Sequence, residues 1–435
     1  MAKGDSDVNL VHELIRKDRE SPLRLAVVGD AIDDTYIDGT LGIGQENCQK
    51  FTETSRISVS GGAENAAKSL VHWNTKAISF ATDAESKTRF MVDGRCIFRH
   101  DAPRRYDSFA KIDRYNAKSA LHSDYSGVLI SDYDKGFLTP EFIREIIDLC
   151  NERKIPCVAD AKREPDLYEG STIKGNADYH DKFNVLAPYC VLTHGPNYPD
   201  VWTPERWSRE DDEGLDKPPR PSVLCKNHVG AGDCFSSHLL LALAHGFTLE
   251  QAAEIAHCAG RVYVQHEHNR PPWPHEIARD YDPVGGKILD VHVLPALRKS
   301  ESGRIVFANG CFDLFGPQHL HYLTKAKELG DGLVVGINTD ESVSRLKGKA
   351  RPLIPQKQRA ILLAGIACVD WVVLFDADDP ASIMSDLKPN VRACTESPNR
   401  NIAGDEFADE LAFIDRMEGW STTSTLESIV KKQTR

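Results

Sequence analysis

The chain has 435 residues, of which 41% are apolar and 27% are charged. That length is too great for one ordinary hydrophobic core, so we expect two domains, and the composition excludes a fibrous or largely disordered chain. With 53 basic and 65 acidic residues, the formal net charge is −12. An acidic chain is a poor general binder of nucleic acid, so an anionic substrate must be met by local positive charge or by backbone amides.

The sequence also predicts the compartment. No apolar run has the length of a membrane helix, and the polar N-terminus MAKGDSDVNL lacks the apolar core of a signal peptide. The eleven cysteines form no CxxC pair, which is typical of reduced thiols without a metal site. We therefore expect a cytoplasmic protein with no membrane partner, no nucleic-acid partner and no metal held by a ligand cluster.

Apolar runs alternate with helical patterns in the first part of the chain. The expected strands are 24–30, 77–81, 127–131, 156–159 and 190–193. The expected helices are 63–71, with apolar residues at helical spacing, and 140–150, with proline at its start. This alternation predicts an α/β domain whose mainly parallel sheet is covered on both faces.

Proline and charge mark two irregular regions. Residues 203–221 are charged and rich in proline, so we expect a surface excursion there. Residues 270–286 hold four prolines and predict the end of the first domain. The predicted domain limits are 20–280 for the first domain, 281–302 for a linker and 303–435 for a smaller α/β domain. Its expected strands are 304–308, 333–338 and 371–375, with helices near 319–329 and 358–366.

A small-residue turn precedes an apolar helical pattern at Gly230, Ala231, Gly232 and Asp233. Glycine leaves the backbone amides unshielded, and a helix N-terminus adds partial positive charge, so this turn can hold a developing anion. Asp233 can accept the proton of an attacking hydroxyl during phosphoryl transfer. A glycine-rich loop with Asp as a helix cap is an equally good interpretation of these four residues alone.

Two other groups of polar and small residues lie at the limits of predicted elements, one after the first strand and one at the start of a helix. Asp30 and Asp34 follow the first strand, where carboxylates can accept hydrogen bonds from a polyol. Gly61 and Gly62 stand before the helix at 63–71 and Asn65 lies in its first turn, where glycine lets a ligand approach and an amide can bridge hydroxyls. Ordinary turn chemistry accounts for each residue taken singly.

The second domain repeats this pattern at the carboxyl ends of its strands. Asn309, Gly310 and Phe312 close its first strand and Asp340 follows the next, at the edge where open α/β sheets bind ligands. The positive charges of Lys347 and Arg351 suit a triphosphate, although for these residues alone a solvated basic loop is the favoured interpretation.

Three hydroxyl residues, Ser421, Thr422 and Thr423, precede a predicted last helix. Hydroxyls and free amides at a helix start can bind phosphate. Simple capping of that helix is the alternative.

Residues 24–268 resemble the ribokinase-like sugar kinases, and most closely the kinase half of the bifunctional heptose-phosphate kinase/ADP-heptose synthase family. The resemblance rests on VVGDAIDDTY, GGAENAA, ISDYDKGFLT, VADAK and HVGAGD, which occur in the family's order and spacing. It implies a ribokinase-like, mainly parallel sheet with a small β lid. Lid strands near 36–60 and 88–100 would also carry a homodimer contact.

The resemblance implies a role for each motif residue. Asp233 would be the base, and Gly230, Ala231 and Gly232 would form the anion hole. The implied sugar-binding residues are Asp30, Asp34, Gly61, Gly62, Asn65 and Arg99. The implied ATP-binding residues are Asn176, Asp178, Thr193 and Gly195, and magnesium would bridge the ATP phosphates.

This part of the chain departs from the family pattern at three positions. Asn227 stands where the family usually has Asp, three residues before GAGD. Tyr179 replaces the glutamate of the family's Pro-Asn-x-x-Glu turn, and the usual Asp-Pro-Lys is Asp160-Ala161-Lys162. These changes affect the positioning of nucleotide and magnesium and leave the implied base in place.

Residues 304–430 resemble the cytidylyltransferase-like nucleotidyltransferases, through NGCFD, GINTDESV, LKG, RP and STT. The resemblance implies a Rossmann-like domain that joins a sugar 1-phosphate to the α-phosphate of ATP. The family's His-x-Gly-His appears here as Gly316-Pro317-Gln318-His319, so only His319 is retained. Losing one donor to the transferring phosphate costs on the order of 2–4 kcal/mol, which predicts impaired transfer.

The two resemblances together predict an enzyme that uses ATP and Mg²⁺. It would phosphorylate D-glycero-D-manno-heptose 7-phosphate to the 1,7-bisphosphate and then make ADP-heptose from heptose 1-phosphate. Two alternatives stay open. The second domain would be a non-catalytic nucleotide-binding or oligomerisation module, or the kinase would act on another sugar or nucleoside, because fold alone does not set specificity.

Overall fold

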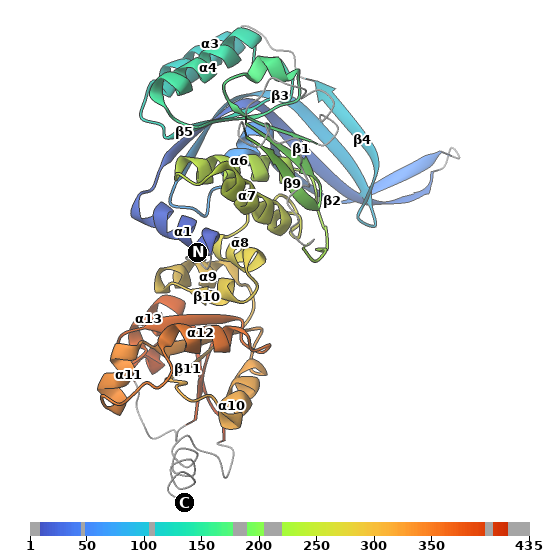
Figure 1. The fold of residues 1–435 in the computed structure, drawn as a ribbon. Helices are drawn as coiled ribbons and strands as arrows, with labels where there is room; N and C mark the ends of the chain where they lie inside the picture. The colour runs from blue at the N-terminus through green and yellow to red at the C-terminus, as the bar shows by residue number, and fades with distance from the viewer. Residues whose placement is uncertain are drawn as a thin grey trace, which may run out of the picture. The chain divides into compact units, whose positions relative to one another are not determined.

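The computed structural model describes residues 9–44, 48–103, 109–176, 189–203, 220–395 and 403–415. It consists of two compact units, Met1–Ile277 and Ala278–Arg435 (Figure 1). Among the described residues, no helix is both long enough and apolar enough to cross a membrane.

A sheet of nine described strands forms the centre of the first unit, in the order β4-β3-β1-β5-β6-β7-β8-β9, with β2 paired to β1. The strands are β1 Arg24–Ile43, β2 Gln49–Gly61, β3 Lys76–Val92, β4 Arg95–Pro103, β5 Gly127–Ser131, β6 Cys157–Asp160, β7 Thr172–Asn176, β8 Cys190–His194 and β9 Asn197–Trp202. Pairs from β3 to β8 are parallel, whereas β2, β4 and β9 add antiparallel partners. The five predicted strands all lie in this sheet.

Helices cover both faces of this sheet (Figure 1). The helices of this unit are α1 Leu10–Glu20, α2 Gly62–Lys68, α3 Phe109–Leu121, α4 Pro140–Arg153, α6 Ala231–Ala244 and α7 Leu249–Tyr263, and the boundary between the two units falls within α8 Pro274–Tyr281. The helices α3 and α4 pack on one face, where Leu121 and Ile143 join the sheet residues Val28 and Ile130 in one core. The helices α6 and α7 lie on the other face, so the predicted covering is confirmed.

The long strands β1 to β4 supply the predicted β lid. Beyond the core, β1 pairs with β2 from Ile32↔Gly61 out to Ile43↔Gln49, and β3 pairs with β4 from Glu85↔Pro103 to Val92↔Arg95. These outer ends project from the sheet in Figure 1. The expected fold of a mainly parallel sheet with a small lid is therefore confirmed.

The second unit is built on six described parallel strands in the order β10-β13-β12-β11-β14-β15. They are β10 Ile288–Leu289, β11 Ile305–Gly310, β12 Gly332–Asn338, β13 Trp371–Phe375, β14 Val391–Cys394 and β15 Glu410–Phe413. Its helices are α9 Leu294–Ser300, α10 Pro317–Lys327, α11 Asp340–Lys347, α12 Gln356–Ala364 and α13 Ala381–Leu387. This is the smaller Rossmann-like α/β domain expected from the sequence.

Residues 281–302 have regular structure. They contain β10, which pairs with β13, and α9, whose Leu294 and Leu297 are fully buried in the core of the second unit. The apolar side chains of this segment therefore belong to a packed core. The predicted limits 20–280 and 303–435 stay predictions.

Candidate functional site

Asp233 lies in the first turn of α6, and its carboxylate is only 2% exposed. The side-chain amide of Asn65 donates to Oδ2 at 2.9 Å, and the hydroxyl of Tyr133 donates to Oδ1 at 2.6 Å. Burial raises the pKa of Asp233 to about 6, although both hydrogen bonds favour the charged form. The side chain is thus ionised at neutral pH while remaining basic enough to accept a proton.

The glycines before Asp233 are required by close contacts. Gly230 caps α6 with φ +85°, and a Cβ there would lie 2.4 Å from the Asn65 amide nitrogen and 2.5 Å from the Tyr263 hydroxyl. A Cβ on Gly232 would lie 3.0 Å from the Lys174 ammonium. The first amides of α6 lack partners within the helix, which is the geometry that binds an anion.

Two lysines bring positive charge to this turn. Lys174 is 1% exposed and its ammonium lies 3.1 Å from Asp160 Oδ1, while the ammonium of Lys162 lies 3.3 Å from the same oxygen. Burial alone would raise the pKa of Asp160, but the two ammonium groups lower it overall. The ammonium group of Lys174 thus brings positive charge close to Gly232, although the chain as a whole is acidic. The contacts of Lys162 and Lys174 with Asp160 were not predicted from the sequence.

The carboxylate of Asp34 lies beside Gly61. A Cβ on Gly61 would approach Asp34 Oδ2 to 2.8 Å, and Asp34 is ion-paired with Arg89 of β3. Gly62 begins α2 with φ +60°, and a Cβ there would collide with the Asp30 carbonyl at 2.2 Å. The predicted residues of β1 and α2 therefore meet, and α2 carries Asn65 to Asp233.

Asp30 supports a neighbouring loop. Its carboxylate accepts the backbone N–H groups of Tyr133 at 3.0 Å, Lys135 at 3.1 Å and Phe137 at 3.3 Å. These bonds order the segment after β5, which the sequence prediction of sugar binding did not anticipate. Arg99 lies apart from this cluster, on the lid strand β4, where it is exposed and pairs with Asp101 at 2.7 Å.

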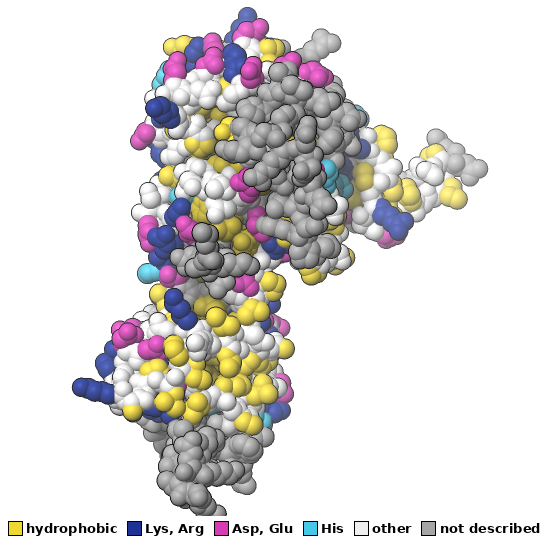
Figure 2. Space-filling model, viewed as in Figure 1, with side chains coloured by type: hydrophobic (Ala, Val, Ile, Leu, Met, Phe, Trp, Pro, Cys, Tyr) yellow, Lys and Arg dark blue, Asp and Glu magenta, His cyan; other side chains and the backbone are white. Residues whose placement is uncertain are grey.

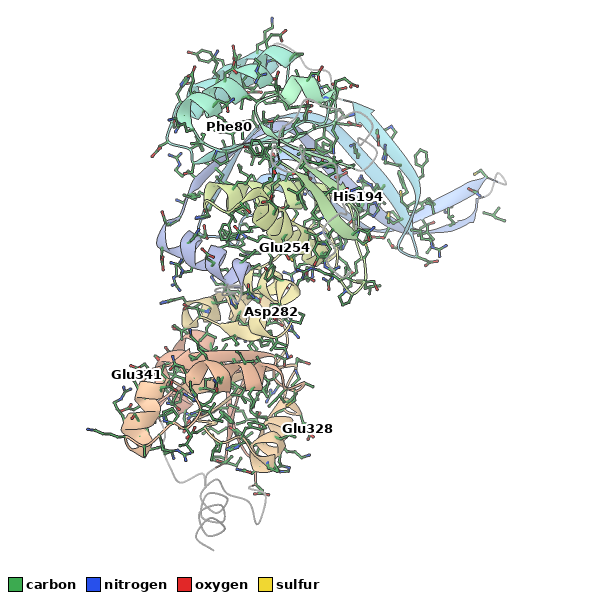
Figure 3. All side chains as sticks on the ribbon, viewed as in Figure 1. Phe80, His194, Glu254, Asp282, Glu328 and Glu341 are labelled. Atoms are coloured by element: carbon green, nitrogen blue, oxygen red, sulfur yellow. The ribbon has the colours of Figure 1, made fainter. Side chains whose placement is uncertain are left out.

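The predicted ATP-binding residues end two adjacent strands. Asn176 closes β7 and Thr193 is in β8, and the Thr193 hydroxyl lies 3.2 Å from the Gly175 carbonyl and 3.4 Å from Asn176 Oδ1. Gly195 follows with φ +61°. His194, labelled in Figure 3, marks this end of β8. Asp178 lies outside the described residues.

Asn227, which replaces the family's usual Asp, connects the turn to other segments. Its side-chain oxygen accepts the Val229 N–H at 3.0 Å, and its amide donates to Asn269 at 2.9 Å. Asn269 in turn donates to the Ser60 carbonyl at 3.4 Å. A neutral amide can bridge these partners because it both donates and accepts.

In the second unit, Asp313 and Arg359 tie the predicted loops together. Asp313 accepts the N–H groups of Leu353 at 2.7 Å and Ile354 at 2.9 Å, and forms an ion pair with Arg351 at 2.6 Å. Arg359, 1% exposed, donates to the carbonyls of Cys311 and Asn338 and to the carboxylate of Asp340. Asn309 and Gly310 end β11, where they pair with Gly336 and Ile337 of β12, and Asp340 begins α11 shortly after β12. The role of Arg359 was not predicted from the sequence, because the partners Cys311, Asn338 and Asp340 are distant in the chain.

His319 occupies the third position of α10, and its ring packs against Phe312 and Phe315. Phe312 has φ +47° and is 6% exposed. Nδ1 of His319 accepts the Gly316 N–H at 3.1 Å, so in the neutral ring the proton sits on Nε2. Burial lowers the pKa of His319, which favours that neutral form. The ring therefore presents one N–H donor.

The side chain of Gln318 folds over Gly316. A Cβ on Gly316 would lie 2.7 Å from Gln318 Oε1 and 3.3 Å from Nε2. The two departures from His-x-Gly-His are thus coupled, because the Gln318 amide fills the space next to the missing histidine.

The remaining predicted residues of this unit lie at the periphery or outside the described residues. Lys347 ends α11 and is exposed. Glu341, labelled in Figure 3, marks the start of the same helix. Ser421, Thr422 and Thr423 are not among the described residues. On the face seen in Figure 2, acidic and basic side chains are interspersed.

Comparison with known proteins matches both units. Residues 307–423 match the Cytidylyltransferase-like family model. The "Bifunctional protein HldE" of Helicobacter pylori (strain Shi470) is 30% identical over 93% of this chain and 98% of its own length. The protein of the same name from a Nitratiruptor species is 30% identical over 97% of each chain. Among solved structures, phosphofructokinase-2 from Escherichia coli aligns with 60% of this chain and 98% of its own, at 14% identity and a TM-score of 0.46.

Proposed function

We propose, from the premise that this chain belongs to the family of bifunctional HldE proteins, that it is a two-activity enzyme of ADP-heptose synthesis. The relatives match over nearly their whole length, so the family covers both units. This favours two activities over the alternative of a non-catalytic second domain. The first unit phosphorylates D-glycero-D-manno-heptose 7-phosphate, and the second unit adenylylates heptose 1-phosphate.

In the kinase step, Asp233 takes the proton of the anomeric hydroxyl while that oxygen attacks the γ-phosphorus of ATP. A new O–P bond forms, the bond to the ADP oxygen breaks, and ADP leaves. The amides of Gly230, Ala231 and Gly232 stabilise the transferring phosphoryl group. The observation that carries this proposal is the buried, hydrogen-bonded Asp233 at the start of α6.

Substrate positions follow from the same cluster. The acceptor sugar lies against Asp34, Asn65, Gly61 and Gly62, with Arg99 of the lid as a partner for the sugar's own phosphate. ATP lies at the ends of β7 and β8, near Asn176, Thr193 and Gly195, and Asp178 stays a prediction for the same site.

Magnesium in this proposal arrives with the ATP phosphates. Among the described residues, no three His, Cys, Asp or Glu side chains cluster as a cation site. The buried carboxylate of Asp160 already contacts two ammonium groups. We therefore assign no protein ligand to the ion, whose chemistry is to neutralise phosphate charge.

In the second unit, an oxygen of heptose 1-phosphate attacks the α-phosphorus of ATP and pyrophosphate leaves. No covalent intermediate is needed, so the residues act by positioning and charge. Asn309, Gly310, Phe312 and Asp340 line the strand ends, with Ser421, Thr422 and Thr423 predicted for the same site. Lys347 and Arg351 offer positive charge to the phosphates, and His319 offers the Nε2 proton as a donor.

The test is incubation of the full chain with ATP and heptose 7-phosphate, followed by phosphorus NMR. We expect a heptose 1,7-bisphosphate signal, and pyrophosphate release when heptose 1-phosphate is supplied instead. Asp233→Asn should abolish the first reaction and retain the second, which shows that the variant is folded. Near-normal kinase turnover by Asp233→Asn would show that the base is wrongly assigned.

The same test separates the remaining alternatives. A panel of sugars and nucleosides in place of heptose 7-phosphate reports the acceptor class. ATP binding without pyrophosphate release would make the second unit a nucleotide-binding module.

A cytoplasmic homodimer through the lid strands is part of the proposal. Ile43 and Phe98 are 81% and 59% exposed on β1 and β4, which supports burial of this lid by a second copy. Light scattering of the intact chain reports the mass. Ile43→Ser with Phe98→Ser should give a monomer if the lid is the contact, and an unchanged dimer places the contact elsewhere.

A further inference from the structure

The hydroxyl of Tyr133 contacts Asp233 directly. It donates to Oδ1 at 2.6 Å, while Asn65 donates to Oδ2 at 2.9 Å. Each carboxylate oxygen offers about two acceptor positions, so each keeps capacity for a further donor. The carboxylate can therefore accept a hydrogen bond from a sugar hydroxyl while both existing hydrogen bonds remain.

The backbone that carries Tyr133 is held by two buried carboxylates. Asp30 accepts the N–H of Tyr133, and Asp132 accepts the N–H of Asp134 at 2.8 Å. The other oxygen of Asp132 is held by Arg163 and by the hydroxyl of Tyr168, at 2.5 Å from each. The Tyr133 hydroxyl is thus a fixed donor rather than a side chain on a free loop.

Lysines flank the ring of Tyr133. The ammonium groups of Lys87 and Lys162 lie 5.7 and 5.4 Å from its centroid, within the range of cation–π contacts. Burial, together with the charge of Asp233, raises the pKa of Tyr133, so the phenol keeps its proton at any pH at which the kinase is assayed. Because the phenol keeps its proton, it can only donate to Asp233 and therefore always favours the charged form of that carboxylate.

We propose that Tyr133 is a positioning residue for phosphoryl transfer, whose hydroxyl keeps Asp233 ionised and oriented towards the acceptor hydroxyl. This inference rests on the proposed role of Asp233 as the base. The described side chains that interact with Asp233 include Tyr133, Asn65, Asp160, Lys162, Lys174, Tyr263 and Cys234. Of these, Tyr133 and Asn65 donate hydrogen bonds to it, so removing either weakens the charged form.

The test is Tyr133→Phe, with kcat/KM of the kinase reaction measured against pH. Losing a hydrogen bond to the carboxylate raises the pKa of Asp233 further, so the acidic limb of the profile should move up by about one pH unit. At pH 6 the loss should be about fivefold, it should approach about tenfold at pH 5, and it should largely disappear at pH 8.5. An acidic limb that stays in place would overturn the proposal.

Tyr168→Phe is the matched control. It removes a buried tyrosine–aspartate bond that supports the same loop through Asp132 but does not touch Asp233. We expect a lower melting temperature and an acidic limb at the wild-type pH. An equal shift in both variants would mean that loop loosening, rather than the hydrogen bond to the base, moves the limb, and the proposal would fail.

A second substitution tests the opposite sign. Incorporating 3-fluorotyrosine at position 133 keeps the ring and makes the phenol a stronger donor, so the acidic limb should move to lower pH. This variant is informative even if Tyr133→Phe folds poorly. If Asp233→Asn is inactive but neither substitution at Tyr133 moves the acidic limb, this inference alone is rejected. If Asp233→Asn is active, the assignment of Asp233 as the base is rejected.

Discussion

At the residue scale, Lys174 supplies the local positive charge that an acidic kinase needs. Its ammonium lies close to Gly232 and shares Asp160 with Lys162. Burial lowers the pKa of Lys174 and the nearby Asp160 opposes that effect. Charge fixed near the anion hole stabilises the transferring phosphoryl group without reorganisation.

We expect Lys174→Met to lower the kinase kcat by about 10–100-fold, or about 1.4–3 kcal/mol, with a smaller change in the KM of the sugar. Steady-state kinetics measure this split. The control is the pair Lys174→Met with Asp160→Asn, which removes the cation together with its partner. Recovery of normal kcat in the pair would mean that Lys174 only neutralises Asp160.

The coupled residues Gly316 and Gln318 give a second prediction. A side chain at position 316 would meet the flexible end of the Gln318 side chain, so Gly316→His alone should displace that amide with little change in melting temperature. Gly316→His with Gln318→Gly removes this contact and restores a second donor, which should raise pyrophosphate release by about 10–100-fold. Assay of the intact chain with heptose 1-phosphate checks this, and an unchanged rate in the pair would show that the missing histidine is not limiting.

Only part of the site was predicted from the sequence. Asp233, Asn65 and the glycines were predicted because helix starts and turns have local signals, and the structure brings them together. The contacts of Tyr133, Lys174 and Arg359 were missed. Each depends on partners between 14 and 100 residues away, and spacing along the chain carries no record of such contacts.

At the element scale, α1 was not predicted and depends on one buried charge. Asp18, 1% exposed, accepts the N–H groups of Asn74 at 2.7 Å and Thr75 at 3.0 Å. Burial would raise the pKa of Asp18, but hydrogen bonds from His245, Thr75 and Asn74 lower it overall. A lowered pKa means that Asp18 stabilises the fold above its unfolded pKa near 4, and that this contribution is lost as pH falls below it.

Asp18→Asn should therefore lower the free energy of unfolding by about 2–3 kcal/mol at pH 7, because hydrogen bonds to a charged group are lost and the new amide faces backbone donors. Urea unfolding at pH 7 and pH 3.5 measures the effect, which should shrink at the lower pH. The control on the same helix is Glu13→Gln, whose half-exposed pair with Lys17 should contribute under about 1 kcal/mol. Equal losses in both variants would contradict the role of Asp18.

The limits of strands were predicted correctly where every residue is buried, and incorrectly where they depend on pairing with other strands. The predicted strand 127–131 coincides with β5, in which every residue is buried. By contrast, β1 was expected to end at residue 30 but continues to Ile43, because its polar outer half pairs with β2 and β3. The predicted helices 319–329 and 358–366 begin two residues earlier, at Pro317 and Gln356. Such limits are set by tertiary contacts and caps.

At the scale of the whole molecule, the order of the proposed reactions makes a prediction about the two units. The kinase product carries phosphates at positions 1 and 7, whereas the transferase acts on a 1-phosphate. A separate phosphatase must remove the 7-phosphate in between, so the intermediate has to leave the chain. Direct transfer from one unit to the other is therefore not part of the proposed sequence.

Two inactive variants should consequently complement each other in solution. Asp233→Asn lacks the kinase base, and His319→Ala lacks the donor of the transferase. An equal mixture with excess phosphatase should make ADP-heptose at about half the wild-type rate for the same total protein, because half of each activity is present and the intermediates diffuse freely. Phosphorus NMR of the mixture, with each variant alone as the control, measures this. A mixture that stays far below half, while each variant keeps its remaining activity, would require the intermediate to pass within one chain and would contradict a freely diffusing 1,7-bisphosphate.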